Sequence, residues 1–468
     1  MSEEFRLVKP VLPPLLDSGF RPAVLANRAF LQEVEDCGVG VPLIFGLERA
    51  GGLLSRHETR VFPDDHPRAG ANLPYAERMF KFLLWQRGAW RVYVGGPRAI
   101  GEQLKAYYAP DGSRSFDYHF MGDDIYSHPF SVVPCDPPEV PAERETGKPL
   151  GRHLDGCRIG FDLGASDRKV SAVINGEPVY SEEVVWEPGV QSDPEYHYRE
   201  IMSALNTAAA KLPRVDAIGG SAAGVYVDNR VRVASLFRGV PQERYDRVRD
   251  LFLRIQDEMG VPLEIVNDGD VTALAGSMSL EDNAVLGIAL GSSEATGYVN
   301  NDGNITGWLN ELAFAPVDYS PHAPVDEWSG DRGCGALYFS QQCVFRLAPQ
   351  VGIVIPDHLT PAERLRFVQD KLESRHSGAL SIWQTMGRYM GYALAHYADF
   401  YVLKHVLILG RCTSGRGGEL ILNGAVEVLE AEFPQLAARL NIQLPDEKSR
   451  RVGQSIAAAS LPLTGRSR

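Results

Sequence analysis

The residues best suited to chemistry lie at 264–276, where a short apolar stretch ends in the polar run Asn267-Asp268-Gly269-Asp270. This pattern predicts a buried strand that passes through a tight turn into a helix. A carboxylate at the carboxyl end of a strand lies where α/β sheets bind ligands, and it can act there as a general base. Asp268 is therefore the candidate base. The alternative is that Asp268 or Asp270 only caps the helix, as aspartates in such turns commonly do.

Two glycine-containing turns could bind phosphate. The first is the run DLGAS at 162–166, where the Ser166 hydroxyl, the nearby Lys169 ammonium and backbone amides could face an anion. The second is the run GSS at 291–293, which separates two predicted strands and could also bring amides close to an anion. Either turn could instead be a plain hairpin. Because each begins a new α/β half, the two together predict a duplicated fold with a cleft between its halves.

The elements that would position these turns are strands that alternate with helices from residue 158 onward, with helices at 198–212 and 242–260. A third glycine-rich turn, at 411–422, follows an apolar strand predicted at 405–410 and leads into a helix. Such a turn can accept a flat base or a phosphate near the helix N-terminus. A simple connection between strand and helix explains it equally well.

The first 150 residues have a different pattern and are predicted to form a separate α/β unit. They contain an amphipathic helix around 74–88 and a strand at 89–96, and a proline-rich, polar linker follows at 135–151. They show no recognisable motif and no pair of short helices with the basic face of a DNA-reading protein. A lid, an oligomerisation surface and a packing extension are each compatible with this unit.

Composition narrows the function classes. A chain of 468 residues is too long for one core and suggests two or three domains, and its net charge of −13 argues against a nucleic-acid partner, which requires clustered Lys and Arg. The first residues combine early acids with a proline-broken apolar run, a pattern that fits neither a secretory signal nor a membrane span. No later apolar stretch has the length of a membrane span. We therefore expect a cytoplasmic protein without a membrane partner. The six cysteines form no CxxC pair, which favours reduced thiols over disulfides.

The order of the motifs resembles that of the ROK family of sugar kinases, within the actin-like, hexokinase-type ATPase superfamily. The resemblance covers roughly residues 156–462 and rests on DLGASDRK, IGGSAAGVYVDN, IVNDGD, LGSSEATGYV, LNELAF, GDRGCGALY and VLILGRCTSGRGG. It implies a two-lobed α/β fold of the hexokinase and actin type, with duplicated ribonuclease H-like lobes at 156–276 and 277–468. We expect the helix near 453–461 to pack back on the first lobe, and residues 1–150 precede both lobes as an extension.

The resemblance also implies roles for single residues. Asp268 would take the proton from the attacking hydroxyl, Asn267 would contact a sugar hydroxyl, and Glu311 would bind the sugar. Asp162 could hold Mg²⁺ through water. The positions that match ATP-binding and phosphate-binding motifs are Asp162, Gly164, Ser166, Lys169, Gly291, Ser292, Ser293, Gly410, Gly415, Gly417 and Gly418.

Several positions depart from the family pattern. The family's zinc site needs a His, which is Phe314 here, and a run of cysteines, of which only Cys334 remains, so we predict no zinc. Ala336 replaces a glutamate and Leu236 an asparagine, while Glu294 places a negative charge beside the second phosphate turn. A lost hydrogen bond to a sugar hydroxyl costs about 0.5–1.5 kcal/mol, so these changes argue against glucose rather than against all acceptors.

We therefore predict an ATP- and Mg²⁺-dependent kinase that phosphorylates a hydroxyl of a sugar, amino sugar, polyol or cyclitol. We expect it to act in the cytoplasm as a homodimer. One alternative is a ROK-like sugar sensor or scaffold with weak catalysis, which the altered phosphate turn and the missing sugar contacts favour. Another is an ATPase coupled to a protein partner through the N-terminal extension.

Overall fold

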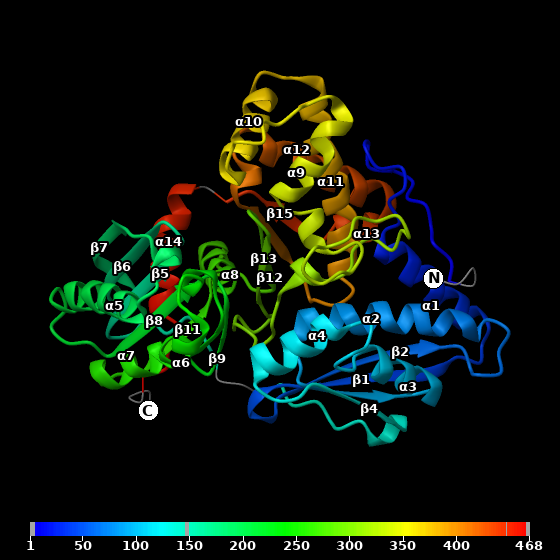
Figure 1. Ribbon diagram of the computed structural model, residues 1–468, viewed down its shortest axis with the longest axis horizontal. Helices are drawn as coiled ribbons and strands as arrows, with labels where there is room; N and C mark the ends of the chain where they lie inside the picture. The colour runs from blue at the N-terminus through cyan, green and yellow to red at the C-terminus, as the bar shows by residue number, and fades with distance from the viewer. Residues whose placement is uncertain (1–4, 146–148, 446, 465–468) are drawn as a thin grey trace. The chain divides into compact units, whose positions relative to one another are not determined.

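The computed structural model describes residues 5–145, 149–445 and 447–464 (Figure 1). Its contacts divide the chain into two compact units: unit 1 comprises residues 1–146, 288–296 and 308–444, and unit 2 comprises residues 147–287, 297–307 and 445–468. The boundaries that the sequence predicts, 1–150, 156–276 and 277–468, stay predictions. Residues 146–148 of the predicted linker lie outside the described residues.

Unit 2 is built on a five-stranded sheet with the order β11-β8-β5-β6-β7. The strands β5 (Cys157–Leu163), β6 (Asp167–Ile174) and β7 (Glu177–Val185) form an antiparallel meander. The strands β8 (Ala217–Ala222) and β11 (Leu263–Asn267) continue the sheet in parallel with β5. The carboxyl ends of β5, β8 and β11 therefore meet at one edge, where ligands bind in such sheets.

Helices cover the middle of this sheet, where β5 and β8 are buried at every position. One core joins the strands with α5 (Pro194–Ala209) and α7 (Leu251–Met259). The single helix predicted at 242–260 is in fact two, α6 (Tyr245–Arg249) and α7, since the backbone at Asp250 leaves the helical region. The helix α14 (Glu447–Ala459) packs against β5, β8 and α8 (Asp268–Leu280).

Two glycines let α14 approach the sheet closely. A Cβ atom added at Gly219 on β8 would lie 1.6 Å from the carbonyl oxygen of Ala458, and one at Gly160 on β5 would lie 1.8 Å from that of Ser455. Backbone therefore contacts backbone at both points, and no larger residue fits without a shift of the helix.

Unit 1 contains a four-stranded sheet with the order β2-β1-β3-β4. Its strands are β1 (Val41–Glu48), β2 (Leu54–Val61), β3 (Arg91–Gly95) and β4 (Ser131–Cys135), and only the β3 and β4 pair is parallel. The helices of this region are α1 (Ala23–Asp36), α2 (Asn72–Arg87), α3 (Arg98–Tyr107) and α4 (Ser115–His119).

The helix α2 differs from the amphipathic helix that we expect near 74–88. It lies where predicted, but 14 of its 16 residues are buried, including Glu77, Arg78, Lys81 and Arg87. Its charged side chains point into the protein because they find partners there, which offsets the cost of removing them from water. Sequence periodicity indicates the helix but not the partners of its polar face.

Unit 1 also contains β14 (His405–Leu409) and β15 (Asn441–Gln443), which belong to a sheet with the order β13-β12-β14-β15. The other strands are β12 (Val285–Leu290) and β13 (Glu294–Val299). The helices that follow are α9 (Gln341–Leu347), α10 (Pro361–Glu373), α11 (Ser377–Tyr397), α12 (Arg416–Glu432) and α13 (Pro434–Ala437). Among the described residues, no helix combines the length and the apolarity needed to cross a membrane.

The packing of α14 can be tested by adding one methyl group. Gly219→Ala should lower the free energy of unfolding by about 1–3 kcal/mol or more, because the new Cβ overlaps a backbone oxygen that cannot rotate away. Thermal or urea unfolding monitored by circular dichroism measures the change.

Gly453→Ala is the matched control, since it adds the same methyl group to α14 itself. The added Cβ would lie 3.7 Å from the Cβ of Ala275, an ordinary contact, and helix propensity favours Ala by about 1 kcal/mol. This variant should be neutral or more stable. Equal destabilisation by both variants would contradict the close approach at Gly219.

Candidate active site

The candidate base, Asp268, is the first residue of α8, and hydrogen bonds hold this end of the helix in place. Asn267 at the end of β11 is the N-cap, and its Oδ1 accepts the Gly269 N–H at 2.7 Å while its Nδ2 donates to the Gly224 carbonyl at 2.8 Å. Asp270 is buried and accepts the Tyr298 N–H at 3.1 Å. Neither Asp268 nor Asp270 is therefore the N-cap of this helix.

A second backbone contact holds the same helix start in place. A Cβ atom added at Gly297 on β13 would lie 2.1 Å from the backbone of Gly269. The first turn of α8 thus rests directly on β13, which leaves Asp268 little freedom to move. Such rigidity is what a proton acceptor requires, because transfer depends on geometry within a few tenths of an ångström.

Asp268 lies beside a second carboxyl group, Asp162. The strand register places Asp162 on β5 opposite Ser221 on β8, and Ser221 in turn opposite Val266 on β11. The Ser221 hydroxyl donates to Asp162 Oδ1 at 2.7 Å. Burial raises the pKa of Asp268 to about 6, with the Asp162 carboxyl as the second cause. Burial also raises the pKa of Asp162, against the opposing effects of Ser221 and Lys169.

The first glycine turn is closed by a residue that we did not predict, Asp167. The Ser166 hydroxyl donates to Asp167 Oδ2 at 3.0 Å, and the Lys169 ammonium lies 3.0 Å from Asp167 Oδ1 and 3.7 Å from Asp162 Oδ2. The Gly164 N–H donates to the Asp167 carbonyl at 2.9 Å. The Ser166 hydroxyl and the Lys169 ammonium, which we expect to face an anion, therefore lie close together. Both contact the Asp167 carboxylate, the first through a hydrogen bond and the second through an ion pair.

The second glycine turn lies in unit 1 and leads to a buried acid. Ser292 and Ser293 are exposed at its tip, and the Gly291 N–H donates to the Ser293 carbonyl at 3.0 Å. Glu294 follows, only 3% exposed, and its Oε1 accepts the Tyr397 hydroxyl at 3.1 Å. Burial, with a smaller contribution from the Glu311 carboxyl, raises the pKa of Glu294 to about 8, although the hydrogen bond from Tyr397 opposes the shift. The negative charge that we expect beside this turn is thus largely absent at neutral pH.

Glu311 itself is half-buried and directly precedes the short 3-10 turn Leu312–Phe314. A Cβ atom added at Gly335 would lie 2.1 Å from Glu294 Oε2 and 2.6 Å from the carbonyl oxygen of Leu312, so Glu294 and the start of this turn pack around the same glycine within unit 1. The predicted sugar contact thus lies close to the second glycine turn.

Packing explains the glycines of the third turn. Gly410 has a φ of 102° and lies against the Leu290 backbone, Gly415 has a φ of 59°, and a Cβ at Gly417 would lie 2.5 Å from the indole nitrogen of Trp383. Gly418 is similarly close to the Thr413 carbonyl. These contacts require small residues whether or not a nucleotide binds. At the start of α12, Glu373 Oε1 already accepts the Arg416 N–H at 2.9 Å.

The residues that depart from the family pattern have apolar or buried surroundings. The Phe314 ring lies 4.4 Å from that of Trp85, centroid to centroid, and Leu236 and Ala336 are buried. Cys334 is fully buried, and burial raises the pKa of its thiol. Within the described ranges, no group of three or more His, Cys, Asp or Glu side chains is arranged to hold a metal.

Unit 2 thus contains the candidate base together with the residues of the first glycine turn. Asp162, Lys169 and Asp268 are close neighbours, while Glu311 and the other two glycine turns lie in unit 1. The sequence analysis missed Ser221 and Asp167. Ser221 could have been found as a polar residue near the carboxyl end of the next parallel strand.

No family model and no curated protein matches the sequence. Among solved structures, the chain is similar to a ROK hexokinase from Thermus thermophilus, with 17% identity and a TM-score of 0.50 over 64% of this chain and 97% of that chain. The chain has the ROK hexokinase fold. The hexokinase-type α/β fold that we predict is thereby confirmed, with additional chain outside the match. At this level of identity the similarity concerns the fold alone.

Two further ROK structures show weaker similarity. One is a ROK family glucokinase from Streptomyces griseus in complex with glucose and AMPPNP, with 18% identity, a TM-score of 0.46, and coverage of 65% of this chain and 99% of that chain. The other is a ROK family transcriptional regulator, a homologue of the E. coli MLC protein, with 17% identity, a TM-score of 0.48, and coverage of 66% and 79%. Both TM-scores lie below 0.5, so the fold assignment does not depend on them.

The raised pKa of the Asp268 carboxyl predicts that replacing it with an uncharged group stabilises the protein. A carboxyl whose pKa is raised on folding favours the folded state below its unfolded pKa and loses that contribution as the pH rises through its folded value. Asp268→Asn should therefore be more stable than the parent by about 1–3 kcal/mol at pH 7.5. The gain should fade between pH 6 and pH 4, as measured by urea unfolding across that range.

Asp257→Asn, on the exposed end of α7, is the matched control and should change the free energy of unfolding little across this pH range. An Asp268→Asn variant whose stability difference does not vary with pH would contradict the raised pKa.

Proposed function

We propose that this protein is an ATP-dependent kinase that phosphorylates a hydroxyl group of a sugar, amino sugar, polyol or cyclitol. The observation that carries the proposal is the carboxyl pair of unit 2, in which Asp268 has a pKa of about 6 beside Asp162. A carboxyl with this pKa is mostly ionised at neutral pH and still accepts a proton readily. The similarity in fold to a hexokinase supports the same class of reaction by analogy.

In this proposal Asp268 takes the proton of the acceptor hydroxyl as its oxygen bonds to the terminal phosphorus of ATP and the bond to the leaving diphosphate breaks. The Gly269 N–H donates to Asp268 Oδ1 at 3.1 Å, which orients the carboxylate from its own helix. Asn267 and Glu311 would bind the hydroxyls of the acceptor. Holding the acceptor in this way aligns its hydroxyl before transfer.

The glycine turns would hold the phosphates. Backbone amides near Gly164 and Gly291, the Ser166 hydroxyl and the Lys169 ammonium are the candidate donors. Because Lys169 and Ser166 contact Asp167, we expect phosphate to compete with Asp167 for both groups. The third turn, with Gly410, Gly415, Gly417 and Gly418, would lie beside the adenosine.

Asp162 is the residue that suits Mg²⁺. This ion keeps several waters and binds through one or two carboxylates together with substrate phosphates. Asp162 Oδ1 already accepts a hydrogen bond from the Ser221 hydroxyl. A contact to Mg²⁺ through water therefore fits this carboxyl better than direct coordination by a full set of protein ligands. When bound, Mg²⁺ would neutralise charge on the phosphates. We propose no zinc, and the cytoplasmic location, the homodimer and the lack of a nucleic-acid partner stay predictions.

A panel of hexoses, amino sugars, polyols and cyclitols tested for ATP consumption examines the proposal. At least one acceptor should support turnover in the presence of Mg²⁺. Asp268→Asn should lower kcat by about 10²–10⁴, because the hydroxyl then lacks its base, while the protein remains folded.

Asp257→Asn should keep the rate of the parent protein, which separates loss of the base from a general loss of negative charge. Turnover by Asp268→Asn at the rate of the parent protein would refute the role of Asp268. Hydrolysis of ATP that requires no acceptor would instead favour an ATPase coupled to a protein partner.

The second candidate function is a sugar-binding sensor or scaffold with little turnover. Glu373 favours it, because its carboxylate occupies the Arg416 amide at the start of α12, where a phosphate or base could otherwise bind. Isothermal titration with ATP and Mg²⁺ distinguishes the two candidates. A kinase binds the nucleotide, whereas sugar binding without nucleotide binding identifies the sensor.

A further inference from the structure

The segment that carries Glu311 is attached to the end of α2, a helix of the N-terminal part of unit 1. The amides of Leu309, Asn310 and Glu311 donate to the carbonyls of Arg87, Gln86 and Trp85, at 3.2, 2.9 and 3.0 Å respectively. The last carbonyls of a helix have no partner within the helix, so these three bonds satisfy groups that would otherwise need water. The position of Glu311, the candidate sugar-binding residue, therefore depends on the position of α2.

Arg87 holds the same segment a second time through its side chain. Its guanidinium carbon lies 3.7 Å from the centroid of the Trp308 ring, a close cation–π contact, and its Nη1 atom lies 3.6 Å from Glu145 Oε1. The Trp308 indole N–H also points to Glu145, with oxygen distances of 3.1 and 3.2 Å. Trp308 is therefore clamped between a cation and an anion directly before the three bonded amides.

Glu145 is itself fixed by the first sheet of unit 1. Arg49 Nη2 lies 2.6 Å from Glu145 Oε2, and the Ser55 hydroxyl also donates to Glu145. Burial alone would raise the pKa of Glu145, but Arg49 and the hydrogen bonds bring that pKa below its ordinary value. The carboxylate is thus charged at neutral pH and pairs with Arg87.

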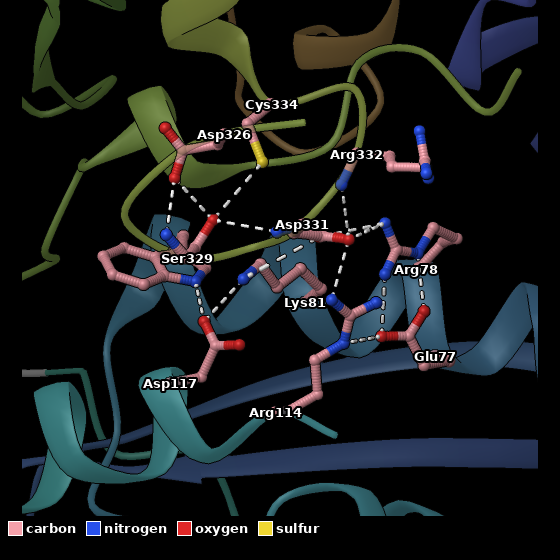
Figure 2. Close-up of polar contacts among 11 residues, drawn as sticks. Glu77, Arg78, Lys81, Arg114, Asp117, Asp326, Ser329, Asp331, Arg332 and Cys334 are labelled. Carbon is pink, nitrogen blue, oxygen red and sulfur yellow. Dashed lines mark hydrogen bonds and ion pairs between the residues drawn. The ribbon is translucent and has the colours of Figure 1, made fainter. Parts of the chain in front are cut away.

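The chain beyond Glu311 is held by α2 as well. The Phe314 ring packs on Trp85, and the loop at 326–334 places Asp331 above the middle of the helix (Figure 2). Asp331 lies 3.0 Å from Arg78 and 2.7 Å from Arg114. Figure 2 also shows Lys81 on the same helix, with Asp117 below it. The Lys81 Nζ atom lies 2.6 Å from Asp117 Oδ1. Lys81 is 0% exposed, so these ion pairs are shielded from water and resist separation.

We infer that the N-terminal part of unit 1 builds the acceptor side of the site, with Arg87 as the positioning residue for the segment 308–311. Arg87 fixes this segment from two sides, through its backbone carbonyl and through its guanidinium on Trp308. The inference rests on the proposed function in one respect, namely that Glu311 contacts the acceptor. It gives the N-terminal residues a role in acceptor affinity rather than in nucleotide binding or in proton transfer.

Arg87→Met tests this role, because it keeps much of the side-chain volume but removes the charge that stacks on Trp308. Hydrogen exchange of the 309–311 amides should become about tenfold faster, since the segment opens more often. With any acceptor that the panel identifies, KM for the acceptor should rise about tenfold, while kcat and KM for ATP stay near those of the parent. Arg87→Lys should give amide exchange rates and a KM for the acceptor between those of the parent protein and those of Arg87→Met.

Arg91→Met is the matched control. The Arg91 guanidinium lies 4.2 Å from the Trp90 ring and 3.6 Å from Glu48 Oε2, a trio of the same kind at the start of β3 and the end of β1. This variant should leave amide exchange at 309–311 and every kinetic constant unchanged. An equal effect of both variants would show that lost stability, not positioning, is responsible.

The proposed kinase function and the inferred role of Arg87 can each fail without the other. If the parent protein turns over no acceptor, the proposed kinase fails, and the exchange rates still decide the inference. Unchanged exchange at 309–311 in Arg87→Met overturns the inference. Faster exchange together with a raised KM for ATP or an unchanged KM for the acceptor also overturns it, because the segment would then not serve the acceptor.

Discussion

Two carboxyl groups confined at one edge of a sheet are the constraint on which the candidate site depends. Asp162 on β5 and Asp268 after β11 are separated by the single strand β8, and like charges at this range oppose each other's ionisation. Ser221 and Lys169 contact Asp162 and favour its charged form, whereas Asp268 has mainly the amide of its own helix turn. Carboxyls with different surroundings can take different roles, one as a proton acceptor and one as a charged support.

The sequence was sufficient to predict the strand before Asp268, the turn that follows it and the order of the glycine turns, because these features are local. It could not predict contacts between distant backbones, such as Gly297 with Gly269 or Gly219 with Ala458. It also could not show that burial would largely remove the charge of Glu294. For the same reason the glycines near Gly415 looked like a nucleotide site, although packing alone accounts for their size.

The N-terminal residues illustrate the limit most clearly. The sequence predicts that their helix α2 is amphipathic, and only the structure shows that Lys81 and Arg87 face partners within the protein in place of solvent. An ion pair in the interior contributes little net stability over an apolar contact, but it specifies which segments must meet. Here such pairs and three backbone hydrogen bonds join α2 to the chain around Glu311, so a part of the protein without any recognisable motif supports a residue that a motif identifies.

The most direct measurement of the central claim, that Asp268 removes the acceptor proton, is the pH dependence of kcat/KM for the acceptor at saturating ATP and Mg²⁺. Since the base must be ionised in the free enzyme, kcat/KM should fall about tenfold per pH unit on the acid side. The midpoint should lie at an apparent pKa of about 6. A profile that stays flat between pH 5 and pH 8 in the parent protein would contradict the assignment of Asp268 as the base.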